Sequence, residues 1–128
     1  MLPFPIQILP GQPIYEQIVH AVKRAVATGH LQPGDRFPAV RTISVELGVN
    51  PNTVQKAATV LINLGVLEVR PGQGSFVAPP SPPSDKRSRL KPIEPIVENL
   101  LVEASRQGLT DDELLAFIQI QARKLKRT

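Results

Sequence analysis

Five side chains that can hydrogen-bond crowd one short stretch of the chain, GVNPNTVQKA: Asn50, Asn52, Thr53, Gln55 and Lys56. They carry amide, hydroxyl or ammonium groups, and such groups match the donors and acceptors that base pairs present in the major groove of DNA. No acidic residue lies between Glu46 and Glu68, and a carboxylate in this stretch would be repelled by the phosphates that line the groove. The stretch therefore predicts a surface that contacts DNA.

The same residues also have a purely structural explanation. Asn50 is a favoured helix N-cap, and Pro51 suits the first position of a helix. Thr53 could simply belong to the first helical turn. Taken singly, each residue is better explained by helix formation than by DNA. The prediction, which includes Pro51 because it opens the helix, therefore depends on the elements around it.

Three helices are predicted to position this stretch. Apolar residues recur three and four positions apart, which is typical of one buried helical face. The first helix should run from Gln12 to Gly29, the second over about 39–47, and the third from Pro51 to Gly65. Their apolar stripes are Ile14, Ile18, Val22, Ala25 and Val26, then Val40, Ile43 and Leu47, then Val54, Ala57, Leu61 and Leu64.

A β-hairpin is predicted directly after the third helix, because residues 67–70 and 75–77 are β-prone and flank the turn sequence PGQG. Two helices joined by a short glycine turn and followed by a hairpin form a winged helix-turn-helix. In a helix-turn-helix, the second helix enters the major groove. The predicted DNA surface then extends to Arg41 at the start of the preceding helix and to Arg70, Gly72 and Gln73 in the wing.

The two ends of this region are less regular. In the opening PFPIQI, alternation of Phe4, Ile6 and Ile8 indicates an extended segment along a sheet edge. A Pro- and Ser-rich stretch, residues 79–91, is expected to be a linker without a packed core. Its basic run has two interpretations of equal weight, a solvated linker or an attraction for phosphates; the run is Lys86, Arg87, Arg89 and Lys91.

The C-terminal region, residues 92–128, predicts two amphipathic helices separated by Gly108. Thr110 and Glu113 form a capping-box pattern at the start of the second helix. A helical hairpin this short rarely holds itself together, so it either folds back onto the preceding domain, residues 1–78, or pairs with a second chain. We expect a dimer, with contacts from Ile93, Ile96, Val97, Leu100, Leu101, Leu114, Phe117 and Ile118.

Composition excludes several other classes of protein. The net charge of +4 is compatible with a polyanionic partner, and the absence of cysteine excludes disulfides and thiolate chemistry. The N-terminus has no signal-peptide pattern and no apolar run could span a membrane, so we expect a cytoplasmic protein. His20 and His30 are isolated, and the acidic residues 111–113 fit a helix start. We therefore expect no enzyme, no metal site and no cofactor.

Residues 13–77 resemble the DNA-binding domain of the GntR family of bacterial transcription regulators. The matching motifs are PIYEQI, G-x-L-x-P-G-D, P-A-V-R, GVNPNTV, LGVLEVR and G-x-G-S-F-V. The resemblance implies that Arg41 contacts DNA, that the residues at positions 50, 52 and 53 touch bases or phosphates, and that Gly72 lies at the wing tip. The chain departs from the family at Gln55, often arginine; at Ala58, often tyrosine; and at Ile62-Asn63, where an acidic residue is usual.

The chain is too short for the large effector domains of most family branches and is similar to the short YtrA-type branch. That branch implies a helical pair for dimerisation and a repressor of a nearby transporter or self-encoding operon, bound to a pseudo-palindromic operator. A small-molecule effector in the dimer interface is compatible with this organisation, although no residue pattern identifies one. The alternatives are a non-specific architectural DNA-binding protein and a winged helix that contacts only protein.

Overall fold

The computed structural model describes residues 2–80 and 85–127. The chain divides into two compact units, Met1–Pro80 and Ser81–Thr128. Each unit has its own helices.

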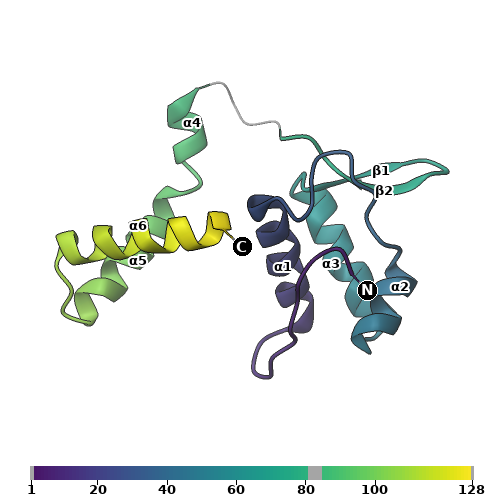
Figure 1. Ribbon diagram of the computed structural model, residues 1–128, viewed down its shortest axis with the longest axis horizontal. Coiled ribbons are helices and arrows are strands. Elements are labelled where there is room, and N and C mark those ends of the chain that lie inside the picture. The colour runs from purple at the N-terminus through teal and green to yellow at the C-terminus, as the bar shows by residue number, and fades with distance from the viewer. Residues whose placement is uncertain (1, 81–84, 128) are drawn as a thin grey trace. The chain divides into compact units, whose positions relative to one another are not determined.

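The first unit has three helices and a two-stranded sheet: α1 (Ile14–Thr28), α2 (Val40–Leu47), α3 (Pro51–Asn63), β1 (Leu67–Arg70) and β2 (Gly74–Val77). Helix α3 packs against both α1 and α2 and continues into β1 (Figure 1). The buried core is formed by Phe4, Ile18, Ala21, Val22, Ala25, Leu31, Phe37, Ile43, Val54, Ala57, Leu61, Leu67 and Val77. The predicted winged helix-turn-helix is confirmed.

Val26, Val40 and Leu47 of the predicted apolar stripes are partly buried against this core, and two other stripe residues are exposed. Helix α1 begins at Ile14 rather than Gln12, because Pro13 has an extended backbone, and the Ile14 side chain is exposed at the helix end. Leu64 is the C-cap of α3 and is also exposed. In both cases the predicted apolar stripe included a residue at a helix end, where the side chain remains in solvent.

The turn between α2 and α3 is held by side-chain and backbone geometry together. Gly48 ends α2 in the left-handed region, at φ 65°. The Ser44 hydroxyl donates to the Val49 carbonyl at 2.6 Å. Asn50 then accepts a hydrogen bond from the Asn52 backbone N–H at 2.8 Å, as an N-cap. These contacts fix the path of the chain between the two helices, and they confirm the predicted stop and start.

The wing is an antiparallel hairpin in which Leu67 pairs with Val77 and Arg70 with Gly74. The Gln73 N–H donates to the Arg70 carbonyl at 2.9 Å, and Gly72 has φ 75°. Proline followed by a glycine of positive φ is typical of a type II turn. The hairpin and its turn were both predicted.

A third extended segment, which no sequence pattern predicted, lies beside β2. The Phe37 N–H donates to the Ser75 carbonyl, and the Val77 N–H donates to the Asp35 carbonyl, each at 2.8 Å. Arg36 and Phe76 form an antiparallel bridge. The segment was missed because only one residue makes the bridge, which is too short for an alternating pattern.

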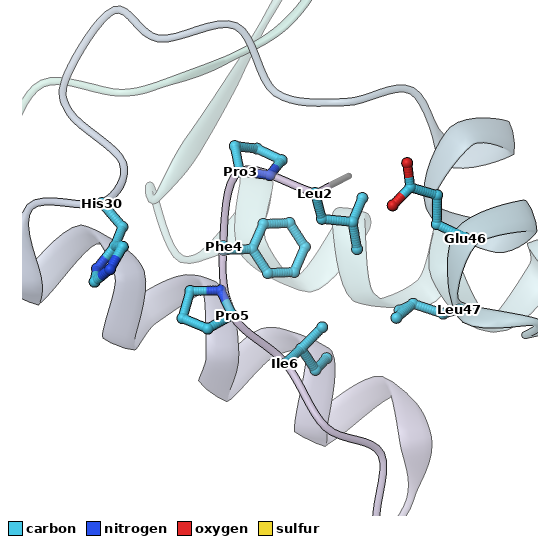
Figure 2. A pocket seen from close by; sticks show the side chains of 8 residues that line it. All are labelled: Leu2, Pro3, Phe4, Pro5, Ile6, His30, Glu46 and Leu47. Atoms are coloured by element: carbon cyan, nitrogen blue, oxygen red, sulfur yellow. The ribbon is translucent and has the colours of Figure 1, made fainter.

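The N-terminal segment packs on the core and does not join a sheet edge within the described residues, so that expectation was wrong. Phe4 is buried and stacks on Phe37, with ring centroids 5.8 Å apart. Further along, the Gln17 side chain bonds both the N–H and the carbonyl of Leu9, at 2.8 Å each. Figure 2 shows Leu2 and Ile6 beside Leu47 of α2, around an open hollow of about 500 Å³. The N-terminal segment is thus held by the stacking of Phe4 on Phe37 and by the hydrogen bonds of Gln17, and not by strand pairing.

The second unit contains α4 (Lys86–Leu90), α5 (Glu94–Arg106) and α6 (Asp111–Arg127). Helix α4 lies within the predicted linker, which is therefore partly helical. Asp85 caps it by accepting from the Arg87 N–H at 3.2 Å and from the Ser88 hydroxyl at 3.1 Å. Among the helices within residues 2–80 and 85–127, none is long and apolar enough to cross a membrane.

The capping box at the start of α6 forms as predicted. The Thr110 N–H donates to Glu113 Oε1 at 2.9 Å, and the Thr110 hydroxyl accepts from the Glu113 N–H at 3.2 Å. The hydrogen bond from the Thr110 backbone, and then the contact with its side chain, hold the pKa of Glu113 below its ordinary value. The folded state therefore favours the charged carboxylate.

Replacing Thr110 by alanine should raise the pKa of Glu113 part of the way toward the ordinary value of a glutamate, because the backbone bond remains while the hydroxyl is lost. An NMR titration of the Glu113 side chain measures this shift. Since the native pKa is lowered, the box stabilises the fold above the ordinary pKa, and this stabilisation is lost as pH falls through the lowered value. A Glu113 pKa that is the same in both proteins would contradict the capping geometry.

Candidate nucleic-acid interface

The first turns of α3 present the predicted recognition residues to solvent. Asn52, Gln55 and Lys56 are exposed, and Thr53 is half-buried. The Asn50 side chain is also exposed, but its carbonyl oxygen is occupied by the cap. Pro51 is exposed at the first helical position. The Asn52 side chain, unlike that of Asn50, is not used in capping the helix, so its amide is available to a ligand.

Lys56 has an aromatic partner that its spacing in sequence did not reveal. Its ammonium nitrogen lies over the Tyr15 ring, 4.1 Å from the centroid, which is a cation–π geometry. Tyr15 donates its hydroxyl hydrogen to Glu16, and the charge of Glu16 raises the pKa of Tyr15. The ring thus stays neutral and holds the lysine between α1 and α3.

Arg41 occupies the second position of α2 and is exposed. The first turn of this helix carries no acidic residue, and the guanidinium forms no ion pair with any residue that the structure describes. A positive side chain beside the positive end of a helix dipole adds to the local positive potential. This combination suits a phosphate or an acceptor-rich guanine edge.

The wing residues divide into two kinds. Gly72 and Gln73 are exposed at the turn, as the prediction requires. Arg70 is instead held in two contacts: its guanidinium bonds the Glu68 carboxylate at 3.1 Å and lies over the Phe76 ring, 4.1 Å from the centroid. Glu68 therefore offsets part of the charge that Arg70 was predicted to offer to DNA.

The second unit exposes a broad apolar face along α5 and α6. Seven of the eight predicted dimerisation residues are exposed: Ile93, Ile96, Val97, Leu100, Leu101, Phe117 and Ile118. The eighth, Leu114, is only 5% exposed within the single chain, so it packs inside the hairpin beside the loop. Among the residues that the structure describes in this unit, the only other buried side chain is Ala104.

The arrangement offers hydrogen-bonding and positively charged groups. Within residues 2–80 and 85–127, no three histidine or acidic side chains gather where they could hold a metal ion. His30 lines the open hollow of Figure 2, in which apolar side chains predominate. The exposed amide, hydroxyl and cationic groups at the start of α3, together with Arg41, suit recognition of a surface rich in hydrogen-bond acceptors and negative charge.

Comparison with known proteins agrees with this geometry. Residues 14–77 match the family model for bacterial regulatory proteins of the gntR family. Over 116 residues, the chain is 31% identical to the HTH-type transcriptional repressor YtrA of Bacillus subtilis, and the match covers 89% of each chain.

Solved structures show the same fold. A transcriptional antiterminator from Listeria monocytogenes EGD-e superposes with a TM-score of 0.82 at 28% identity, over 96% of this chain and 92% of that one. The DNA-binding domain of AraR, solved in complex with operator ORE1, superposes with a TM-score of 0.50 at 27% identity. That match covers 59% of this chain and 92% of the AraR chain.

Proposed function

Because the chain belongs to the gntR family of bacterial regulatory proteins, in its YtrA-type branch, and is a DNA-binding transcriptional regulator, we propose that it is a dimeric repressor of a pseudo-palindromic operator. In this proposal, residues 1–78 bind DNA and residues 92–128 form the dimer. Residues 79–91 are the linker between these two regions. Helix α3 enters the major groove, and the wing follows the neighbouring backbone.

One observation carries the proposal of sequence-specific binding. The start of α3 presents amide, hydroxyl and ammonium groups from Asn52, Thr53, Gln55 and Lys56, while Asn50 caps the same turn. Side chains with paired donors and acceptors can distinguish base pairs in the major groove, whereas cations alone mainly bind phosphates. The amides therefore favour an operator-specific regulator over an architectural DNA-binding protein.

Dimerisation is supported by the second unit. With Ala104 and Leu114 as the only buried side chains among its described residues, a unit of this size lacks the core that a separate fold needs. A second copy placed against the exposed faces of α5 and α6 would supply it as a four-helix arrangement. Two-fold symmetry would then present two α3 helices to two half-sites.

Repression is proposed from the resemblance to YtrA, which is named a transcriptional repressor. The branch further suggests that the operator lies by a transporter operon or by the operon that encodes the regulator. A winged helix that contacts only protein is disfavoured by the absence of carboxylates at the start of α3.

Selection of duplexes from a random pool by the full-length protein tests the proposal. The selected duplex and a shuffled version of it are then compared by fluorescence anisotropy near physiological salt. We expect a preference of roughly a thousandfold or more for the selected duplex, with a two-fold symmetric consensus. Equal, steeply salt-dependent binding to both duplexes would instead identify an architectural DNA-binding protein.

A further inference from the structure

Arg36 lies on the face of the wing that points away from the core. Its bridge to Phe76 places it in register with that residue, which itself pairs with Glu68 of β1. Residues paired in register share one face of a sheet. The neighbouring pair, Leu67 and Val77, is buried on the opposite face. Arg36 therefore sits on the outer face of the wing, which is also the face of Arg70.

The two arginines on this face differ in their partners. Arg70 is paired with Glu68 and stacked on Phe76, as described above. Arg36 is exposed and forms no ion pair with any residue in the described ranges. The carboxylate nearest in sequence, Asp35, instead accepts a hydrogen bond from the Gln32 backbone N–H at 2.8 Å. The uncompensated positive charge of the wing therefore belongs to Arg36.

Arg36 lies where the wing meets helices α2 and α3. Together with Gly74 of the wing, Val40 of α2 and Ala58 of α3, it lines a hollow of about 160 Å³. A Cβ added at Gly74 would lie 3.7 Å from Arg36 Nη2 and 3.9 Å from Nε. The guanidinium thus lies close to the backbone of Gly74. Because glycine has no side chain, a ligand can approach the wing backbone closely there. Arg41 follows Val40 directly in the chain.

We propose that Arg36 binds a DNA backbone phosphate beside the wing and is the wing's main phosphate-binding side chain. Arg70 instead holds the wing together through Glu68 and Phe76. A guanidinium matches phosphate oxygens with two parallel hydrogen bonds. A phosphate contact fixes the orientation of the protein on the duplex without reading sequence. This assignment rests on the proposed binding of double-stranded DNA, and Arg36 lies outside the DNA surface predicted from the sequence.

The test compares full-length Arg36→Gln, Arg36→Lys and Arg70→Gln proteins by anisotropy over a series of salt concentrations. The matched control is Arg24→Gln, which removes the same charge from an exposed position on α1, beside the N-terminal segment. Each protein is titrated with the selected duplex and with its shuffled version. Circular dichroism and a thermal melt establish that each variant is folded.

For Arg36→Gln we expect about tenfold weaker binding to both duplexes, which corresponds to one charged hydrogen-bonding group. The slope of log K against log salt should become shallower by about 0.9, the value for one phosphate contact. Arg36→Lys should keep the slope, and Arg24→Gln should match the native protein. Arg70→Gln should lower the melting temperature more than it changes the slope.

An unchanged slope for Arg36→Gln, or a larger slope change for Arg70→Gln, would overturn the assignment. So would a loss confined to the selected duplex, because that pattern indicates base contact rather than phosphate contact. These results are separable from failure of the proposed function. If the native protein does not distinguish the two duplexes, operator-specific regulation is wrong, yet the salt slope on either duplex still tests Arg36.

Discussion

Replacing Leu100 by aspartate should convert the protein into a monomer and weaken operator binding by roughly a hundredfold or more. Leu100 is 40% exposed on the apolar face of α5, where a second copy would cover it. A carboxylate buried there without a partner strongly disfavours association. The monomer then loses the gain from binding two linked half-sites, which is on the order of a hundredfold to ten-thousandfold. Sedimentation velocity measures the mass, and anisotropy measures the affinity.

Helix α5 also provides a matched control. Val102 is 57% exposed but lies two positions further along, on the opposite side of the helix from the face of Leu100. The Val102→Asp protein should remain a dimer and bind the operator normally. Removal of residues 92–128 should give a monomer as well. If the truncated chain or the Leu100→Asp protein still sediments as a dimer, the role of this region in dimerisation is wrong.

Replacing Asn52 by alanine should weaken operator binding by roughly tenfold to a hundredfold while leaving binding to shuffled DNA nearly unchanged. An amide that bonds a base edge with two contacts contributes about 1–3 kcal/mol of discrimination. The substitution leaves the helix start intact, because the cap uses the backbone N–H of Asn52 and the side chain of Asn50. Anisotropy with both duplexes, together with a thermal melt, measures the effect.

Two comparisons sharpen this result. Asn50→Ala should lower the melting temperature as well as the affinity, because it removes the N-cap, which typically contributes about 1 kcal/mol. Arg41→Ala should weaken operator binding with the fold intact, since its side chain forms no ion pair with the described residues. If operator affinity is unchanged in both Asn52→Ala and Arg41→Ala, these residues do not form the recognition surface.

Elements with local signals were predicted from the sequence. The N-cap at Asn50, the left-handed stop at Gly48, the turn at Gly72 and the capping box at Thr110 each depend on residues within a few positions of one another. These caps and turns can therefore be predicted from a short stretch of sequence. The order of these elements was then sufficient to identify the winged helix-turn-helix and to locate its recognition helix.

Contacts between distant residues could not be predicted in this way. Lys56 meets Tyr15 only because α3 packs on α1, and Arg36 joins the wing through a single bridge to Phe76. Arg70 was selected for its charge, but Glu68, two positions earlier on the same face of β1, pairs with it, and this local contact was overlooked. Helix α4 was not predicted, because the composition around it is rich in proline. A local signal was nevertheless present, since Asp85 caps the helix by accepting hydrogen bonds from the Arg87 N–H and the Ser88 hydroxyl.

The sparse core of the second unit has a consequence for how the regulator would respond to its own abundance. If α5 and α6 complete their packing only against a partner, dimer formation rises with the square of the monomer concentration when protein is scarce. Promoter occupancy would then switch on over a narrow range of gene dosage. Unpaired chains would meanwhile display apolar helices to cellular proteases, which would clear them and sharpen that threshold.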